Sequence, residues 1–99
     1  MNVGKVIGRA ALLELMAEEC SEMAQACLKM ARKLRKENPT PLSEAEIWEH
    51  VNEEAADVEI CIESLLLSGV LSRSEMNAQK KFKEARWEER LKEKENKNG

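Results

Sequence analysis

Two pairs of acidic residues have the types and the spacing that could bind a ligand. Glu19 and Glu22 lie three residues apart in MAEECSEMAQACLKM, and Glu54 and Asp57 lie three apart in VNEEAADVEI. Side chains three apart on a helix project from one face and can share a ligand. Oxygen ligands without His or Cys suit a hard cation. We therefore expect these four residues to bind Mg²⁺, with Mn²⁺ as a possible substitute.

A first helix, expected over residues 8–36, must position the first pair. Its apolar residues are spaced alternately by three and four, the heptad pattern of helices packed side by side. The ENPTP stretch ends this helix, because proline lacks an N–H donor and disfavours helix in the preceding residue. We expect the seam facing the neighbouring helix to be Leu13, Met16, Cys20, Met23, Cys27, Met30 and Leu34.

A second helix, expected from Ser43 to Ser68, carries the second pair. Ser43 and Glu46 can form a capping box at its start, and Gly69 stops it. Its C-terminal half, VEICIESLLL, is apolar on more than one side, which predicts a homo-oligomer. The expected seam is Ile47, Val51, Glu54, Val58, Cys61 and Leu65.

A third helix should begin near Ser72, where Glu75 can form another capping box, and Trp87 should pack it down. The composition, rich in Ala, Leu, Glu and Lys, predicts an all-α protein. We expect an antiparallel bundle of three to four helices over residues 1–92, completed by oligomerisation. Residues 93–99 form a charged tail with nothing to bury, and we expect it to be disordered.

The cysteines Cys20, Cys27 and Cys61 form neither a CxxC motif nor a Cys/His cluster. An odd number cannot pair completely within one chain. We interpret them as small buried apolar residues rather than as redox or zinc ligands.

The two acidic pairs meet if the first two helices form an antiparallel hairpin. Counted from Thr40, in the linker, Glu22 lies 18 residues back and Glu54 lies 14 forward, so their levels differ by about one turn. Four carboxylates facing one another at a core boundary require a cation or raised pKa values. Solvated acids that share a spacing by chance are the alternative, because 35% of the residues are charged.

Amines follow the acids along the first helix. Lys29 and Lys33 continue the face of Glu19 and Glu22, an arrangement that suits a metal-bound polyphosphate. The alternative is that they only complement the helix dipole. Trp48 offers a stacking surface for a nucleotide base, unless it closes the core below the linker.

The motifs EECSE and EEAAD resemble the EExxE and ExxD motifs of the MazG-like, all-α nucleoside triphosphate pyrophosphohydrolases. The resemblance covers residues 8–92. It implies a homodimer or homotetramer that uses Mg²⁺ to cleave a nucleoside triphosphate into a monophosphate and pyrophosphate. It makes Glu19, Glu22, Glu54 and Asp57 the metal ligands and Glu18 the residue that orients or deprotonates water. Phosphate contacts in KEARWEERL would come from Lys83, Arg86 and Arg90.

The chain departs from the family pattern in two places. The segment containing ENPTPLSEAEIWEH is longer than in many members. Members often carry an Asn among the basic residues of the last helix, whereas this chain has Ala85 in that region and Asn77 earlier. A non-catalytic helical interaction module and a nucleotide-binding regulatory module are the alternatives to an enzyme.

The distribution of charge limits the partners. The formal net charge is −3, and the acidic excess lies in residues 1–71, which would repel a nucleic acid. No apolar run approaches the roughly 20 residues that cross a bilayer, and no secretory signal is evident. We therefore expect a soluble, cytoplasmic protein without nucleic-acid or membrane partners.

Overall fold

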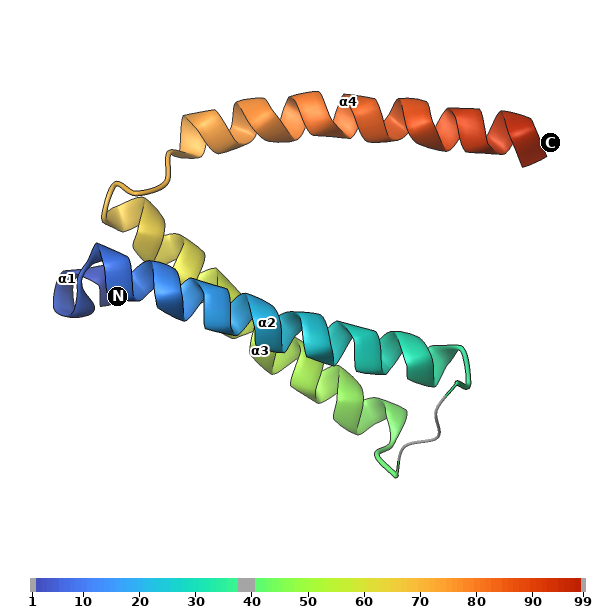
Figure 1. The fold of residues 1–99 in the computed structure, drawn as a ribbon, viewed down its shortest axis with the longest axis horizontal. Helices are drawn as coiled ribbons and strands as arrows, with labels where there is room; N and C mark the ends of the chain where they lie inside the picture. The colour runs from blue at the N-terminus through green and yellow to red at the C-terminus, as the bar shows by residue number, and fades with distance from the viewer. Residues whose placement is uncertain (1, 38–40, 99) are drawn as a thin grey trace.

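The computed structural model describes residues 2–37 and 41–98, and this part of the chain contains helices and no strands. The all-α prediction is confirmed. Figure 1 shows α2 and α3 crossing as a long antiparallel pair, with α1 beside them and α4 as a separate arm. The helices are α1 (Val3–Ile7), α2 (Arg9–Leu34), α3 (Glu44–Leu67) and α4 (Arg73–Asn98).

The start of α3 is fixed by the predicted capping box. Ser43 Oγ accepts a hydrogen bond from the Glu46 N–H at 3.2 Å, and Glu46 Oε1 accepts one from the Ser43 N–H at 3.3 Å. Both bonds satisfy N–H groups that have no partner within the helix. Gly69, with φ of 77°, follows the helix as predicted, because glycine adopts this left-handed conformation without steric cost.

The other helix ends differ in detail from the sequence prediction. Gly8, with φ of 86°, separates α2 from α1, a short helix that the sequence analysis did not predict. α2 ends at Leu34, before the ENPTP stretch, whose residues 38–40 lie outside the described part. At the start of α4, Ser72 Oγ accepts a hydrogen bond from the Glu75 N–H at 3.3 Å.

The core lies between α2 and α3, with α1 closing one end. Its buried apolar residues come from both long helices, so each stabilises the other through burial. The Val3 N–H of α1 donates to Ser64 Oγ of α3 at 3.3 Å, which satisfies a fully buried hydroxyl. The buried apolar side chains are Leu12, Ala26, Met30, Ile47, Cys61 and Leu65.

The predicted seam was right for α3 and largely wrong for α2. On α3, Ile47, Glu54, Cys61 and Leu65 are buried, whereas Val51 and Val58 are half-buried. Of the residues predicted for the α2 seam, only Met30 is buried, and Met16 and Met23 are half-buried. The exposed seam residues are Leu13, Cys20, Cys27 and Leu34.

The error on α2 has a physical cause. The helix carries apolar residues on two faces, and the face with Leu12, Ala26 and Met30 turns toward α3. Cys20 and Cys27 are therefore exposed within this chain, in contrast to the expected burial, and only Cys61 is buried. The spacing alone did not distinguish the face that packs within the chain from the face that does not.

α4 extends from the hairpin without packing along it (Figure 1). Trp87 is 61% exposed, so the expectation that it packs this helix against the others was wrong for the single chain. The helix continues through residues 93–98, where we expected disorder. Strong helix formers and the Glu93–Lys97 pair, four residues apart, favour this extension.

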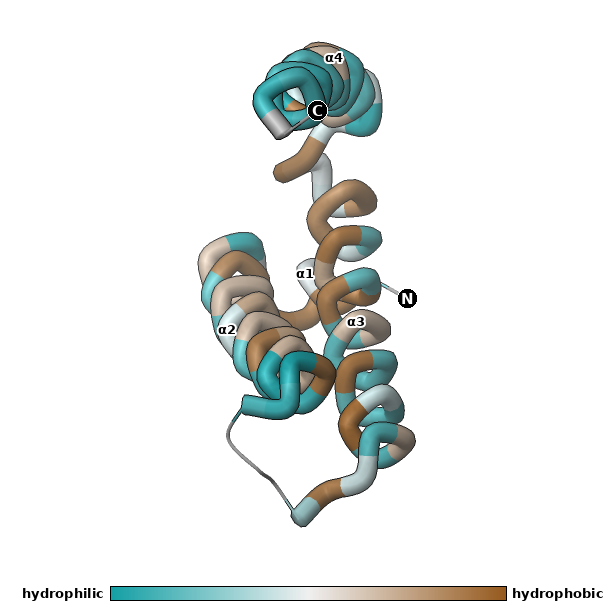
Figure 2. The backbone as a smooth tube through the Cα atoms, turned by 90° about the vertical axis from the view of Figure 1, so that its right-hand side faces the viewer, coloured by the Kyte–Doolittle hydropathy of each residue, from teal (hydrophilic) through white to brown (hydrophobic). Residues whose placement is uncertain are grey.

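The helix α4 differs in hydropathy from the hairpin of α2 and α3. Figure 2 shows apolar stretches along α3, concentrated toward its junction with α4, whereas α4 itself is mostly hydrophilic. Among the helices of residues 2–37 and 41–98, none is both long and apolar enough to cross a membrane.

Candidate functional site

The hairpin brings together the four acids that the sequence singled out. Glu19 is half-buried and Glu22 is exposed on α2, and Glu54 is buried on α3. One carboxylate oxygen from each lies within 4.8 Å of the others. Antiparallel packing produces this meeting because the two pairs lie at similar distances from the linker. We call Glu19, Glu22, Glu54 and Asp57 the acidic cluster.

Asp57 joins the acidic cluster through Glu19. The two carboxyl groups are close enough to share a hydrogen bond, which exists only when one of them carries a proton. Burial raises the pKa of Glu19, and the negative charges of Glu22, Asp57 and Glu54 raise it further. The same causes, burial first and then Glu22, raise the pKa of Glu54. Each ionised carboxylate thus makes the next one harder to ionise.

Two oxygens of the acidic cluster are buried without a hydrogen-bond donor. They are Oε2 of Glu19 and Oε2 of Glu54. Buried polar atoms in native proteins normally have a hydrogen-bond partner, so the lack of one at these two oxygens indicates that a ligand binds them. Three carboxylates from two helices, with oxygens within 4.8 Å of one another and two of those oxygens unsatisfied, fit a hard divalent cation. The acidic cluster therefore offers the oxygen ligands that Mg²⁺ or Mn²⁺ prefers.

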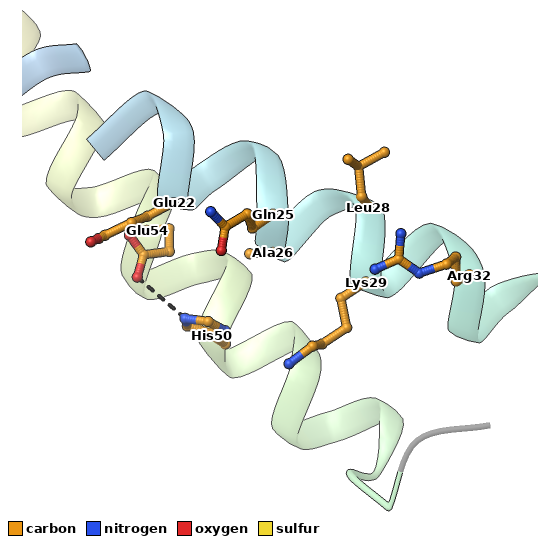
Figure 3. A pocket seen from close by; sticks show the side chains of 8 residues that line it. All are labelled: Glu22, Gln25, Ala26, Leu28, Lys29, Arg32, His50 and Glu54. Atoms are coloured by element: carbon orange, nitrogen blue, oxygen red, sulfur yellow. Dashed lines mark ion pairs between the residues drawn. The ribbon is translucent and has the colours of Figure 1, made fainter. Parts of the chain in front are cut away.

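A cleft of about 510 Å³ opens beside the acidic cluster, between α2 and α3. Glu22 and Glu54 form its acidic end, and Lys29 lies further along α2 with its amine directed toward α3 (Figure 3). Arg32 adds a second cation on the same side. A ligand in this cleft would meet carboxylates at one end and cations at the other. The remaining lining residues are Gln25, Ala26, Leu28 and His50.

His50 is a site residue that the sequence analysis missed. Its Nε2 lies 3.2 Å from Oε1 of Glu54 (Figure 3), and a protonated His50 lowers the pKa of that carboxyl group. The signal was present in the sequence, because residues four apart on a helix contact each other.

Cys61 lies under the acidic cluster. Burial raises the pKa of its thiol, and the charges of Glu19 and Asp57 raise it further. A thiol with a raised pKa stays protonated, and a protonated thiol is a poor nucleophile and metal ligand. The structure thus supports the interpretation of Cys61 as a small buried residue.

The other predicted residues of the hairpin lie outside the cleft lining. Lys33 is half-buried, and Glu18 is exposed on α2 beside the acidic cluster. Trp48 is 44% exposed in the first turns of α3, two residues before His50.

The predicted phosphate contacts of the last helix are all exposed on α4, which does not pack on the cleft. Lys83 lines a separate hollow along α4. The Arg86 guanidinium lies 5.8 Å from the centroid of the Phe82 ring, a cation–π contact. Within one chain, Lys83, Arg86 and Arg90 are therefore not brought to the acidic cluster.

Comparisons with models of protein families, with curated proteins and with solved structures give no match to this chain.

Proposed function

We propose that the chain is a Mg²⁺-dependent nucleoside triphosphate pyrophosphohydrolase of the MazG-like kind, which gives a nucleoside monophosphate and pyrophosphate. One observation carries the proposal. Carboxylates from two helices meet within 4.8 Å, two of their oxygens have no donor, and they border a cleft whose far end is basic. This order of charges complements a metal-bound polyphosphate.

The residues of the hairpin have distinct roles in this proposal. Glu19, Glu22, Glu54 and Asp57 would hold the ion, which when bound neutralises phosphate oxygens and lowers the pKa of a bound water. Lys29 would neutralise phosphate oxygens further along the cleft through charge-assisted hydrogen bonds, assisted by its neighbour Arg32.

His50 would orient Glu54, because its Nε2 contacts that carboxylate. The roles of Glu18 at the water and Trp48 at the base stay predictions from the sequence. In the proposed homodimer or homotetramer, Lys83, Arg86 and Arg90 would contribute only through α4 of another copy.

The test is release of pyrophosphate from a panel of ribonucleoside and deoxynucleoside triphosphates in Mg²⁺. We expect activity, and a loss on the order of 100-fold or more in Glu19→Gln and Glu54→Gln, as for disrupted metal sites. Glu59→Gln is the matched control, because Glu59 is an exposed acid of α3 outside the acidic cluster. Activity that both cluster variants retain in full would refute the site assignment.

A second candidate function rests on the exposed apolar residues of α4. Phe82, Trp87 and Leu91 are each more than 60% exposed, which suits a helical interaction module.

A nucleotide-binding regulator is distinguished from the enzyme by its response to a nucleotide. Metal-dependent thermal stabilisation by a triphosphate without any product would favour the regulator over the enzyme.

A further inference from the structure

The helix α4 carries its charges on separate sides. With about 100° between successive residues, an arc of about 100° over residues 73–94 holds Met76, Trp87 and Leu91, and every other side chain on that arc is a cation. All six glutamates of α4 lie outside this arc. We call it the basic face, and its cations are Arg73, Lys80, Lys83, Arg90 and Lys94.

The basic face is uncovered within the chain. No other helix of residues 2–37 and 41–98 packs along α4, which extends from the hairpin as an arm (Figure 1). Trp87 is 61% exposed, and Leu91 is 63% exposed. Among the described residues, none of the cations of this face forms an ion pair. Exposed apolar side chains among unpaired cations mark an interaction surface for an acidic partner.

An apolar hollow adjoins the basic face near the start of α4. It has a volume of about 570 Å³ and lies between α4 and the segment that joins α4 to α3. Residues 70–71 and Met76 are half-buried and give the hollow apolar surface. Lys80 and Lys83 line it on the side of the basic face, and Glu75 is the one acid in its lining. The hollow therefore offers a place for an apolar side chain directly beside two cations.

This combination favours a protein partner over a membrane or a nucleic acid. Cations lie between the apolar side chains of the basic face, so the face has no continuous apolar strip to insert into lipid. A nucleic acid offers phosphates to the cations but no apolar side chain to the hollow, and the acidic excess of residues 1–71 would repel it. An amphipathic helix with carboxylates beside an apolar strip offers both kinds of group.

We propose that the basic face and the hollow bind an acidic amphipathic helix of a partner protein. One apolar side chain of that helix would enter the hollow, and others would pack on Trp87 and Leu91. Its carboxylates would pair with the cations between them. From Met76 to Lys94 the face is about 27 Å long, which matches a partner helix of about five turns. The inference does not depend on the proposed hydrolase activity, because the acidic cluster belongs to the hairpin.

Binding of a designed peptide tests the chemistry of the partner. The probe is a fluorescein-labelled helical peptide of about three heptads, with Leu at the a and d positions and Glu at the e and g positions. The comparison peptide carries Lys in place of each Glu. We expect fluorescence anisotropy to show that the acidic peptide binds this chain and that the basic peptide does not. Equal binding of both peptides, or no binding of the acidic one, would overturn the proposal.

Charge reversals on two sides of α4 test the surface. Lys80→Glu with Lys94→Glu changes the basic face, whereas Lys81→Glu with Lys92→Glu changes two exposed lysines outside it, and neither pair includes a predicted phosphate contact. We expect the first pair to weaken peptide binding about tenfold, because each ion pair becomes a like-charge contact. The second pair should bind as the wild type does. Trp87→Ala should also weaken binding about tenfold, as the loss of an aromatic anchor. Equal weakening by both pairs, or full binding by Trp87→Ala, would contradict the proposal.

The first pair of substitutions also tests the other occupants of the basic face. We expect phosphatidylglycerol vesicles and a DNA duplex of mixed sequence to bind the wild type more weakly than the acidic peptide does at about 0.15 M salt. We also expect light scattering to give the same mass for the wild type and for Lys80→Glu with Lys94→Glu. Tighter binding of lipid or DNA that this pair abolishes would assign the face to that ligand. A lower mass for the folded pair would show that a second copy covers the face, and either result would overturn the proposal.

Discussion

Replacing Glu54 by Gln should change thermal stability in opposite directions with and without metal. In wild type, oxygens of Glu19, Glu22 and Glu54 lie within 4.8 Å of one another, so the metal-free cluster carries uncompensated negative charge. The substitution removes one charge and keeps a side-chain oxygen that can accept a hydrogen bond from His50. The metal-free variant should therefore melt at a higher temperature than the wild type.

Adding metal should reverse the order of the two melting temperatures. A ligand present at 100 times its Kd stabilises a folded protein by about 2.7 kcal/mol, which for a chain of 99 residues raises Tm by roughly 10–20 °C. Loss of one ligand should weaken binding on the order of 100-fold. At the same metal concentration the variant then gains only about 0.4 kcal/mol, or about 2–3 °C.

The assay is melting followed by circular dichroism, in EDTA and then in increasing Mn²⁺ or Mg²⁺. Glu59→Gln should behave as wild type in both conditions, because it removes an acid of α3 outside the acidic cluster. A variant that melts lower than wild type in EDTA, together with equal metal shifts in the two proteins, would refute the reasoning about this cluster.

The remaining predictions concern pH, phosphate binding and packing. Because the pKa values of Glu19 and Glu54 are raised above the usual 4.5, the metal-free folded protein holds more protons than the unfolded chain above that pH. Its free energy of unfolding should fall as pH rises from about 4.5 toward 7, and urea titrations showing a rise would contradict this. Lys29→Gln should raise the KM for the Mg²⁺-bound triphosphate about tenfold with little change in kcat, the loss of one charge-assisted hydrogen bond, and an unchanged KM would remove Lys29 from the binding site. Gly4→Ala should destabilise the fold by about 1–3 kcal/mol, because the added Cβ would lie 2.7 Å from Cδ2 of the fully buried Leu12. An unchanged urea midpoint would show that Leu12 moves aside freely.

Local sequence alone determined the starts of α3 and α4 and the stop of α3. The box of Ser43 and Glu46 and the stop at Gly69 depend on neighbouring residues, and the structure contains both. The meeting of Glu22 and Glu54 also followed from counting along two helices that share one linker. These features depend on short-range geometry, which a spacing of three or four residues already fixes.

Only the tertiary structure decided which face of α2 packs inward. Both the inner face with Leu12 and the exposed face with Cys20 and Cys27 are apolar, and helical periodicity treats them alike. The sequence also did not predict the position of α4, because we expected Trp87 to pack this helix down, and in the single chain it is exposed. Periodicity reports that a helix has apolar surface to bury, whereas the shape of the neighbouring helix decides which part of it is buried there. That is why the acids could be found from the sequence, while the cleft beside them and the exposure of Cys20 and Cys27 could not.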